Sequence, residues 1–234
     1  MKFQARITEI RQETPTIKSF VLDYNGQPFS FLPGQWIDLV LVIDGETAVA
    51  GYSMTSSPLR AGSIQLAIKY SANHKVTRYL HERARVGEQV TISNGSGTFY
   101  YRREMGDRLV LIGAGVGVTP LLSILRFVHE AHPEVSVTLL YSAAVPREIL
   151  FADELQRMAA QNPRIRLLIS VTKPAGSGWD GLTGRIDADK LRLAGLDTAN
   201  LYYICGPSDM VDDTAAELTR LGMPRERIIF EKWW

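Results

Sequence analysis

The sequence predicts two domains, an N-terminal antiparallel β-barrel followed by an α/β domain with a parallel sheet. The chain has 234 residues, more than the roughly 150 of an average single domain. Its first half shows short strand signals between turn residues, whereas its second half alternates apolar strands with helical segments. Residues 1–103 hold 12 basic and 8 acidic residues, and residues 104–234 hold 14 and 17. We therefore place the domain boundary between residues 103 and 104.

The first half is predicted to form a barrel of short antiparallel strands. Turn dipeptides such as Asn25-Gly26, Pro33-Gly34 and Asp44-Gly45 separate its apolar segments. One helix, over residues 76–84, interrupts the strands, and many short strands with regular turns favour a small barrel. The strands are expected at residues 3–10, 17–22, 36–43, 51–54, 64–70 and 89–92.

The second half is predicted to form a parallel sheet covered by helices. Apolar runs of strand length are each followed by a loop and a helix-like segment, a pattern typical of a sheet buried on both faces. Ligands of such sheets bind beyond the carboxyl ends of the strands, where the loops begin. The join between the halves is short and charged, so we expect the domains to pack together. The strands are expected at residues 109–112, 135–141, 165–170 and 201–204.

Composition excludes several classes of protein. A net charge of +1 gives no global electrostatic case for a nucleic-acid partner. One cysteine, Cys205, and four histidines allow no intrachain disulfide and no metal-finger spacing, so we expect a reducing, cytoplasmic setting and no metal site. The N-terminus lacks the apolar core of a secretory signal. An uncharged run over residues 109–125 contains three glycines and a proline, which favour a strand, a turn and a helix over a membrane span.

The strongest local motif is a glycine-rich turn after the first strand of the second half. Gly113, Gly115 and Gly117 leave room for a phosphate group, with Thr119 as the expected N-cap and Pro120 as the first helical residue. Such a helix N-terminus binds anions, and a dinucleotide diphosphate is the obvious candidate. A tight turn without a ligand is the alternative. The motif differs from the standard Rossmann fingerprint, whose third glycine is missing here.

Five segments of the second half form a recognisable pattern, and the similarity that they introduce spans essentially the whole chain. They are residues 113–120, Tyr141-Ser142, residues 151–155, residues 205–208 and residues 230–234. In order and spacing they resemble the ferredoxin-NADP reductase superfamily. The resemblance implies a flavin-binding barrel followed by a pyridine-nucleotide domain, the division that the residue patterns predict separately. It also implies an oxidoreductase that passes hydride from NADH or NADPH to bound FAD, which is favoured over FMN.

The resemblance implies that Tyr52, Ser53, Met54 and Thr55 belong to a flavin-binding strand. In the family the tyrosine lies along the isoalloxazine ring, and the serine hydroxyl, here a candidate catalytic group, hydrogen-bonds the N5 edge. A half-buried strand without a ligand is the alternative. The arginine that the family usually has two positions before this tyrosine, where it holds a flavin phosphate, is Ala50 here.

A basic segment follows the predicted barrel strands and has a net charge of +4 over residues 69–85. By resemblance its loop and helix start bind flavin phosphates, although the family's usual glycine and serine are His74 and Thr77 here. Our hypothesis is that this segment offsets the missing arginine; a solvated charged face is the alternative. The candidate cofactor-binding residues are Lys69, Lys75, Val76, Thr77 and Arg78.

By resemblance, Cys205, Gly206 and Pro207 lie on the nicotinamide side of the second domain. Cys205 is a candidate spacer at the site of hydride transfer, since no neighbouring histidine makes it a nucleophile. A small buried apolar residue is the alternative. Ser142 is a candidate nucleotide contact, and Glu231 is a candidate proton relay or merely the ion-pair partner of a base such as Lys232.

The chain ends in Trp233 and Trp234. Large aromatic side chains are costly to leave in water, so we expect this terminus to dock on the protein. By resemblance the two rings would cover the flavin and move aside for the nicotinamide. Packing in the core is the alternative.

The electron acceptor is not disclosed by the sequence. One cysteine cannot hold an iron–sulfur cluster, so we expect electrons to leave to a small redox protein or a small molecule. NADH is slightly favoured over NADPH, because Ala143 and Ala144 stand where NADPH-selective relatives place arginines. A phosphate site made by Ser142, Arg147 and Lys173 is the alternative. A catalytically weak nucleotide-binding, regulatory or electron-transfer subunit and a dehydrogenase without flavin stay open, as does the oligomeric state.

Overall fold

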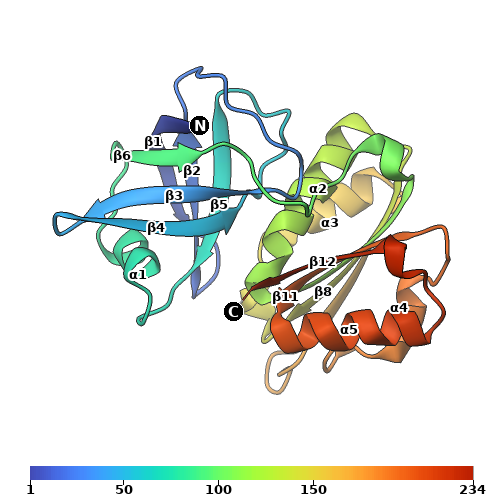
Figure 1. Ribbon diagram of the computed structural model, residues 1–234. Coiled ribbons are helices and arrows are strands. Elements are labelled where there is room, and N and C mark those ends of the chain that lie inside the picture. The colour runs from blue at the N-terminus through green and yellow to red at the C-terminus, as the bar shows by residue number, and fades with distance from the viewer. Residues whose placement is uncertain (234) are drawn as a thin grey trace.

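The computed structural model describes residues 1–233, which form an antiparallel barrel-like sheet beside a parallel α/β sheet (Figure 1). The first sheet has the strand order β4-β3-β6-β1-β2-β5, and all its strand pairs are antiparallel. The predicted fold class is confirmed. The elements of this part are β1 (Lys2–Gln12), β2 (Ile17–Asp23), β3 (Trp36–Ile43), β4 (Glu46–Ser53), β5 (Ser63–Lys69), α1 (Lys75–Glu82) and β6 (Gln89–Ser93).

Strand β4 is longer than the sequence predicts. Asp44 and Gly45 have φ values of 55° and 81°, the pair of positive values that a two-residue hairpin turn requires. Pairing therefore starts at once, with Ile43 opposite Glu46, and continues to Ser53 opposite Trp36. The hairpin fixes which residues of β4 face the barrel interior.

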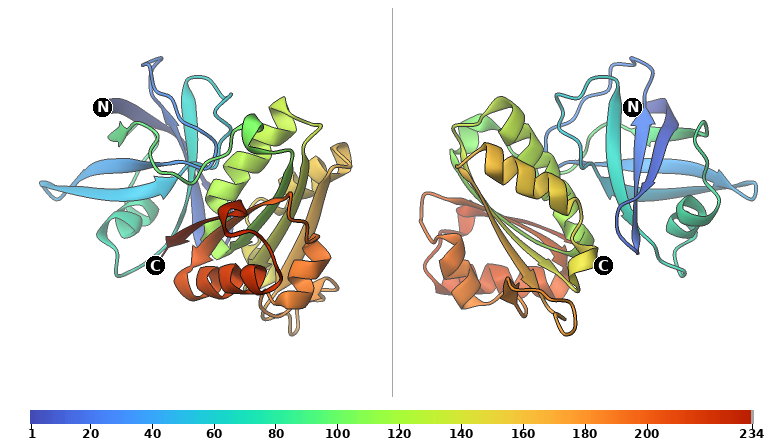
Figure 2. Two further views of the ribbon diagram at one scale, coloured as in Figure 1. Left: turned by 45° about the vertical axis from the view of Figure 1, so that its right-hand side comes forward. Right: turned by 180° about the vertical axis from the view of Figure 1, so that it is seen from behind.

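The second sheet is parallel and has the order β10-β9-β8-β7-β11-β12. Helices α2 and α3 cover one face, and α4 and α5 cover the other (Figure 2). Of these strands, β10 and β12 were not predicted. The elements are η1 (Arg103–Met105), β7 (Arg108–Ala114), η2 (Gly115–Gly117), α2 (Val118–Ala131), β8 (Ser136–Ala143), η3 (Pro146–Glu148), α3 (Ala152–Gln161), β9 (Ile165–Val171), β10 (Leu182–Thr183), α4 (Ala188–Ala194), β11 (Leu201–Pro207), α5 (Ser208–Arg220), η4 (Arg225–Arg227) and β12 (Ile228–Trp233).

The start of α2 differs from the prediction. The short helix η2 runs directly into α2, so that Gly117 is the N-cap and Thr119 lies inside the first turn. As the second residue of the helix, Thr119 does not cap it; its hydroxyl instead donates to the carbonyl of Val116 at 2.9 Å. Pro120 is the third helical residue, where an intrahelical N–H bond is still not needed. The predicted capping role of Thr119 and first position of Pro120 are therefore wrong.

Polar contacts tie the two sheets' domains together. The Tyr203 hydroxyl donates to the carbonyl of Tyr100 at 2.8 Å, and the hydroxyls of Thr14 and Thr16 each donate to Glu148 at 2.8 Å. The predicted domain boundary falls within η1 and stays a prediction. Within residues 1–233, no helix is both long and apolar enough to cross a membrane.

Candidate active site

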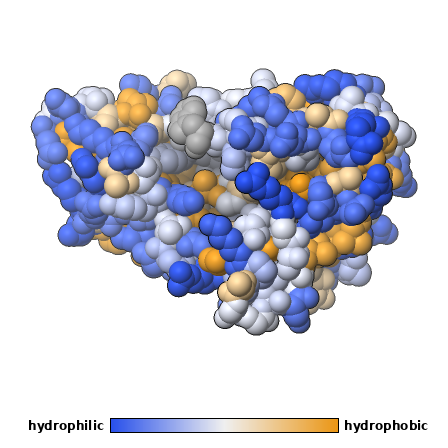
Figure 3. All heavy atoms as spheres, turned by 90° about the horizontal axis from the view of Figure 1, so that it is seen from below, coloured by the Kyte–Doolittle hydropathy of each residue, from blue (hydrophilic) through white to orange (hydrophobic). Residues whose placement is uncertain are grey.

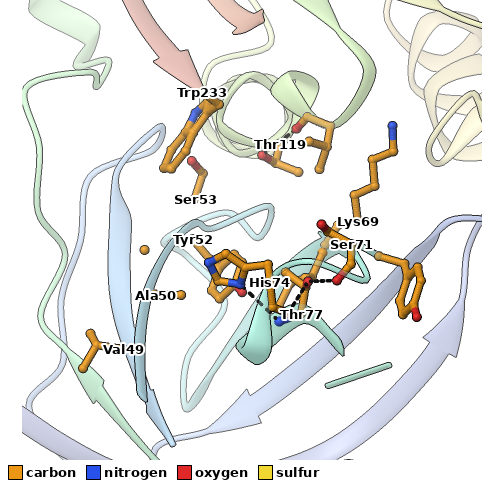
Figure 4. A pocket seen from close by; sticks show the side chains of 15 residues that line it. Val49, Ala50, Tyr52, Ser53, Lys69, Ser71, His74, Thr77, Thr119 and Trp233 are labelled. Atoms are coloured by element: carbon orange, nitrogen blue, oxygen red, sulfur yellow. Dashed lines mark hydrogen bonds between the residues drawn. The ribbon is translucent and has the colours of Figure 1, made fainter. Parts of the chain in front are cut away.

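A pocket of about 430 Å³ lies where the two domains meet. From below, a recess between the domains shows apolar atoms with polar residues on either side (Figure 3). Strands β4 and β5 and the start of α1 form one wall, and the glycine turn and the end of β12 form the other (Figure 4). Its lining includes Ala50, Tyr52, Ser53, Lys69, Ser71, His74, Thr77, Val116, Thr119 and Trp233.

Tyr52 and Ser53 bring two unsatisfied hydroxyl groups to this pocket. Neither the Tyr52 Oη nor the Ser53 Oγ has a hydrogen-bond partner among residues 1–233, although both atoms are buried. Burial also raises the pKa of Tyr52 above its ordinary value, so the phenol stays protonated. Leaving a buried hydroxyl unpaired costs about 1–3 kcal/mol. The pair therefore fits a bound group with polar atoms along an aromatic edge, as a flavin has.

The next two residues of the predicted flavin strand do not line the pocket. Met54 is fully buried in the barrel core and pairs with Leu66 on β5. Thr55 is also fully buried, and its hydroxyl lies 3.1 Å from the carbonyl of Gln65, to which it donates. Strand β4 ends at Ser53, and beyond it these two side chains turn into the barrel core and toward β5 rather than into the pocket.

The basic segment divides into residues that line the pocket and residues that do not. Lys69 and Thr77 line it, and so does His74, the N-cap of α1, whose Nδ1 accepts a long 3.5 Å bond from the Thr77 N–H. Lys75 instead forms an ion pair with Glu46 at 2.6 Å. That ion pair lowers the pKa of Glu46 and joins α1 to the β3–β4 hairpin.

Two further members of the basic segment lie elsewhere. Val76 is buried in the barrel core, and Arg78 is exposed and does not belong to the pocket lining. The helix periodicity places these two side chains on faces of α1 that turn away from the pocket. The pocket is thus lined by the cationic side chain of Lys69 and by the N-terminal end of α1.

The glycines of the turn have different structural roles. A side chain at Gly117 would place its Cβ 2.5 Å from the Cys205 carbonyl oxygen, so this glycine allows β11 to pass close to η2. At Gly113 a Cβ would lie 2.8 Å from Leu121 Cδ1. Gly115 has a φ of 54° and open space around its missing side chain. Packing needs Gly113 and Gly117, whereas Gly115 is favoured by its positive φ and leaves open space beside the backbone.

The ends of β11 and β12 place Cys205, Glu231 and Trp233 together. Cys205 pairs with Glu231 across the parallel strands, and Pro207 pairs with Trp233. Burial raises the pKa of the Cys205 thiol well above its ordinary value, so the thiol stays protonated and unreactive; its role as a spacer stays a prediction. Gly206 is the penultimate residue of β11, between Cys205 and Pro207.

Glu231 is a half-buried residue whose carboxyl group has a raised pKa. Burial raises its pKa to about 7, and a hydrogen bond with Trp233 opposes that effect. Its Oε2 atom has no hydrogen-bond partner among residues 1–233. Lys232 does not pair with it, because the Lys232 ammonium binds Asp212 at 2.7 Å. The predicted ion pair of Glu231 with Lys232 is therefore wrong, and the proton relay stays a prediction. Trp234 lies outside the described residues.

Ser142 lies at the end of β8, opposite Ser170, and is buried. The backbone amide of Lys173 donates to the carbonyl of Ala144 at 2.8 Å, which closes the loop that follows. Arg147 in η3 is exposed. Positions 143 and 144, where β8 ends, therefore carry no cationic side chain.

Some residues of the site were not predicted. Val116, Ser71 and Tyr70 line the pocket through loop geometry, which gives no sequence signal. Arg126, in the middle of α2, does not line the pocket but binds the carbonyl of Thr55, which follows the pocket strand. Its position as the charged residue within the otherwise uncharged stretch of residues 118–128 was the signal that could have identified it.

Two family models match the chain, one to each domain. The model described as "Oxidoreductase FAD-binding domain" matches residues 4–101, and that described as "Oxidoreductase NAD-binding domain" matches residues 111–216. The chain belongs to the FAD- and NAD-binding oxidoreductases. The predicted resemblance to the ferredoxin-NADP reductase superfamily and the predicted FAD and pyridine-nucleotide cofactors are confirmed.

Relatives of this oxidoreductase cover nearly all of its length. "Oxidoreductase NAD-binding domain-containing protein 1" of Danio rerio is 33% identical over 99% of this chain and 92% of its own length. The "Glycine betaine monooxygenase reductase subunit" of Chromohalobacter salexigens is 31% identical over 88% of this chain, which spans 57% of that protein. The FAD/NAD-binding domain of a Vibrio cholerae nitric oxide dioxygenase superposes with a TM-score of 0.87 at 26% identity, covering 99% and 98% of the two chains.

Proposed function

We propose that this oxidoreductase passes hydride from NADH to FAD at the interdomain pocket and delivers electrons to a separate redox protein. The observation that carries the proposal is the pair of unsatisfied hydroxyls of Tyr52 and Ser53, two residues that share one pocket with Val116, Thr119 and Trp233 of the nucleotide domain. When bound, FAD supplies the redox chemistry: it accepts a hydride, which is two electrons and a proton, and releases electrons one or two at a time.

The wall from the barrel is assigned to the flavin. Tyr52 would supply an aromatic face and a phenol donor, and the Ser53 hydroxyl would hydrogen-bond the reactive edge of a bound ring. At the other end of the pocket, His74, Thr77 and Lys69 surround the N-terminus of α1. Its amide groups and positive potential suit a flavin diphosphate. Lys75 and Arg78 are not needed in this arrangement.

The wall from the nucleotide domain is assigned to the nicotinamide. Cys205 is fully buried behind this wall, where its small, neutral side chain would leave room for the nicotinamide, and Trp233 lines the pocket where it would cover a bound flavin ring. Glu231, with a pKa near 7, holds or releases a proton at its Oε2 atom close to neutral pH. Gly115, Ser142, Gly206 and Pro207 are assigned to the nucleotide backbone contacts on the same side.

The preference for NADH rests on the end of β8. Selective binding of a 2′-phosphate uses arginine, which offers two parallel N–H donors. Ala143 and Ala144, where β8 ends, offer none. NADH, which lacks that phosphate, leaves no charge unpaired at this position.

The acceptor is proposed to be a separate one-electron protein. Two relatives are named as parts of oxygenase systems, the glycine betaine enzyme above and a component of the 1,2-phenylacetyl-CoA epoxidase of Escherichia coli, which is 31% identical over 98% of this chain. This chain spans 57% and 66% of their lengths. Its single cysteine cannot itself hold a cluster. We expect no nucleic-acid partner at a net charge of +1, and a cytoplasmic location.

Anaerobic mixing tests the proposal. The protein is reconstituted with FAD and mixed with NADH and with NADPH in parallel, and the flavin absorbance is followed. Complete bleaching by NADH, with at least tenfold slower or weaker bleaching by NADPH, is expected. A protein that binds FAD but is bleached by neither nucleotide would be a regulatory or nucleotide-binding subunit. A protein that takes up no FAD would contradict the proposal outright.

A further inference from the structure

Arg126, in the middle of α2, uses its whole guanidinium group in contacts with other elements. Its Nε and Nη2 donate to the two carboxylate oxygens of Glu154 on α3 at 2.7 Å each. Its Nη1 donates to the carbonyl of Thr55 and to the side-chain oxygen of Gln65, at 2.8 Å each. The side chain is only 11% exposed. Two of its four hydrogen bonds therefore cross into the barrel domain.

The segment that Arg126 holds is the one that follows the flavin wall. Thr55 comes two residues after Ser53, and β5, which carries Gln65, also ends at the pocket. One turn earlier on α2, the Ser123 hydroxyl donates to the carbonyl of Ser56 at 2.7 Å in a fully buried contact. Residues three apart on a helix share a face, so Ser123 and Arg126 bind two successive carbonyl groups.

The same helix carries the nucleotide wall. Helix α2 continues directly from the glycine turn of η2, and Val116 and Thr119 line the pocket near its N-terminus. From Thr119 to Arg126 the helix rises by only about 10 Å, at 1.5 Å per residue. A short rigid element thus connects both walls of the pocket.

Phe151 completes the contact. Its ring lies 4.7 Å from the Arg126 guanidinium carbon, and its backbone adopts a left-handed conformation with a φ of 54°. That conformation is unfavourable for a bulky residue and persists only where the surroundings enforce it. A bidentate ion pair within the α/β domain would need neither this strain nor the two bonds to the barrel.

We propose that Arg126, assisted by Ser123, is a positioning residue that fixes the spacing between the flavin wall and the nucleotide wall for hydride transfer. The proposal rests on the proposed function. Its physical reason is that hydride transfer needs the donor and acceptor atoms within about 3–3.5 Å, and a displacement of about 1 Å can lower the rate by about 100-fold. Arg126 contacts neither cofactor-facing hydroxyl, so it acts through the segment of residues 55–56.

Arg126→Lys tests this, with Ser123→Ala as a milder variant and Arg108→Lys as the control. Lysine keeps the charge but cannot form the fork of hydrogen bonds. Arg108 forms an exposed ion pair with Asp197 inside the α/β domain. In single-turnover flavin reduction at saturating NADH, we expect rates about 10- to 100-fold lower for Arg126→Lys, about 3- to 10-fold lower for Ser123→Ala, and unchanged for Arg108→Lys. FAD content and the Kd for NADH should stay within about threefold.

A second measurement separates this proposal from the proposed function. Amide hydrogen exchange over residues 52–57 should speed up in Arg126→Lys and Ser123→Ala and not in Arg108→Lys. Lower thermal stability with unchanged reduction rates and exchange would reduce Arg126 to a structural ion pair and overturn the proposal. If Arg126→Lys does not fold, Ser123→Ala decides by the same criteria. If FAD-loaded wild type is not bleached by NADH, the proposed function fails, and unchanged exchange over residues 52–57 would then reject the positioning role as well.

Discussion

The unsatisfied hydroxyls of Tyr52 and Ser53 show how a binding site differs from a core at the level of single residues. Most buried polar groups in a folded protein have a partner, because an unpaired one costs about 1–3 kcal/mol. These two groups are buried, adjacent in sequence and on the wall of one pocket. The sequence motif predicted both residues, but only the structure shows that their hydroxyl groups lack partners within residues 1–233.

Replacing Ser53 by alanine should have opposite effects on the free and the FAD-bound protein. Removal of an unpaired buried hydroxyl leaves the apoprotein equally stable or more stable, by up to about 1 kcal/mol, whereas the complex loses a hydrogen bond. We expect an FAD Kd about 5- to 10-fold higher, measured by flavin fluorescence, and an unchanged or higher apoprotein Tm. A lower apoprotein Tm with an unchanged Kd would show that the hydroxyl serves the fold instead.

Glu231 makes stability depend on pH. Its pKa is raised from 4.5 to about 7 by burial, so between these values the folded chain holds a proton that the unfolded chain has released. The free energy of unfolding therefore falls as pH rises through this window. Glu231→Gln removes the effect, and the variant should gain about 1–3 kcal/mol relative to wild type between pH 5 and pH 8.

Urea denaturation of the apoprotein at pH 5 and pH 8 measures this difference. Glu130→Gln, which changes an exposed carboxylate at the end of α2, is the matched control and should show no such gain. An equal pH dependence in Glu231→Gln and wild type would mean that Glu231 titrates as an ordinary exposed carboxylate.

At the scale of elements, α1 shows the limit of charge counting. The sequence predicted Lys75 and Arg78 as flavin ligands because they lie in a basic run, but the run wraps around a helix and its members face different ways. Lys75 binds Glu46 and Arg78 lies outside the pocket lining, whereas Thr77 and the N-cap His74 line it. The ion pair between Lys75 on α1 and Glu46 on β4 joins residues far apart in the sequence, so the local charge pattern does not encode it.

Lys75→Ala combined with Arg78→Ala should leave FAD binding nearly unchanged. With neither side chain in the pocket lining, we expect the FAD Kd to change by less than about threefold, while Lys69→Ala weakens binding by about fivefold or more. Equilibrium titration with FAD at low salt compares the variants. A tenfold loss in the double variant would restore the hypothesis that this basic face offsets Ala50.

Substitutions at His74 separate two properties of this position: its capping of the N-terminus of α1 and the charge that it places at this end of the pocket. Asparagine and aspartate are nearly isosteric and both are strong N-caps, so both should keep the apoprotein as stable as wild type. Only aspartate places a negative charge at the pocket end assigned to the diphosphate. We expect His74→Asn to keep the FAD Kd within about threefold and His74→Asp to raise it about tenfold or more. Equal affinities for the two variants would place the diphosphate elsewhere.

The same scale explains where element prediction succeeded and failed. Alternating apolar residues and turn dipeptides predicted the barrel strands, and continuous apolar runs predicted the four central strands of the parallel sheet. The start of α2 was missed because a short helical turn precedes it without a break. Strand β12 was missed because its pattern is that of an edge strand with charged residues, which becomes a strand only through pairing with β11.

At the scale of the whole molecule, the pocket exists only because two domains pack against each other. Its walls come from residues 49–77 on one side, from residues 116–119 in the middle of the chain, and from Trp233 at its end. Sequence motifs predicted which segments take part, but they could not show which side chains face the junction. That depends on domain packing through contacts such as Arg126 with Thr55 and Glu148 with Thr14.

The crystal structure of the FAD-loaded protein tests the central claim most directly. The flavin ring should lie against Tyr52 with its reactive edge within hydrogen-bond distance of the Ser53 hydroxyl, and the diphosphate should lie at the N-terminus of α1. The open face of the ring should point toward Trp233 and the glycine turn. A flavin bound outside the interdomain pocket, or one whose ring leaves the hydroxyls of Tyr52 and Ser53 unpaired, would contradict the account.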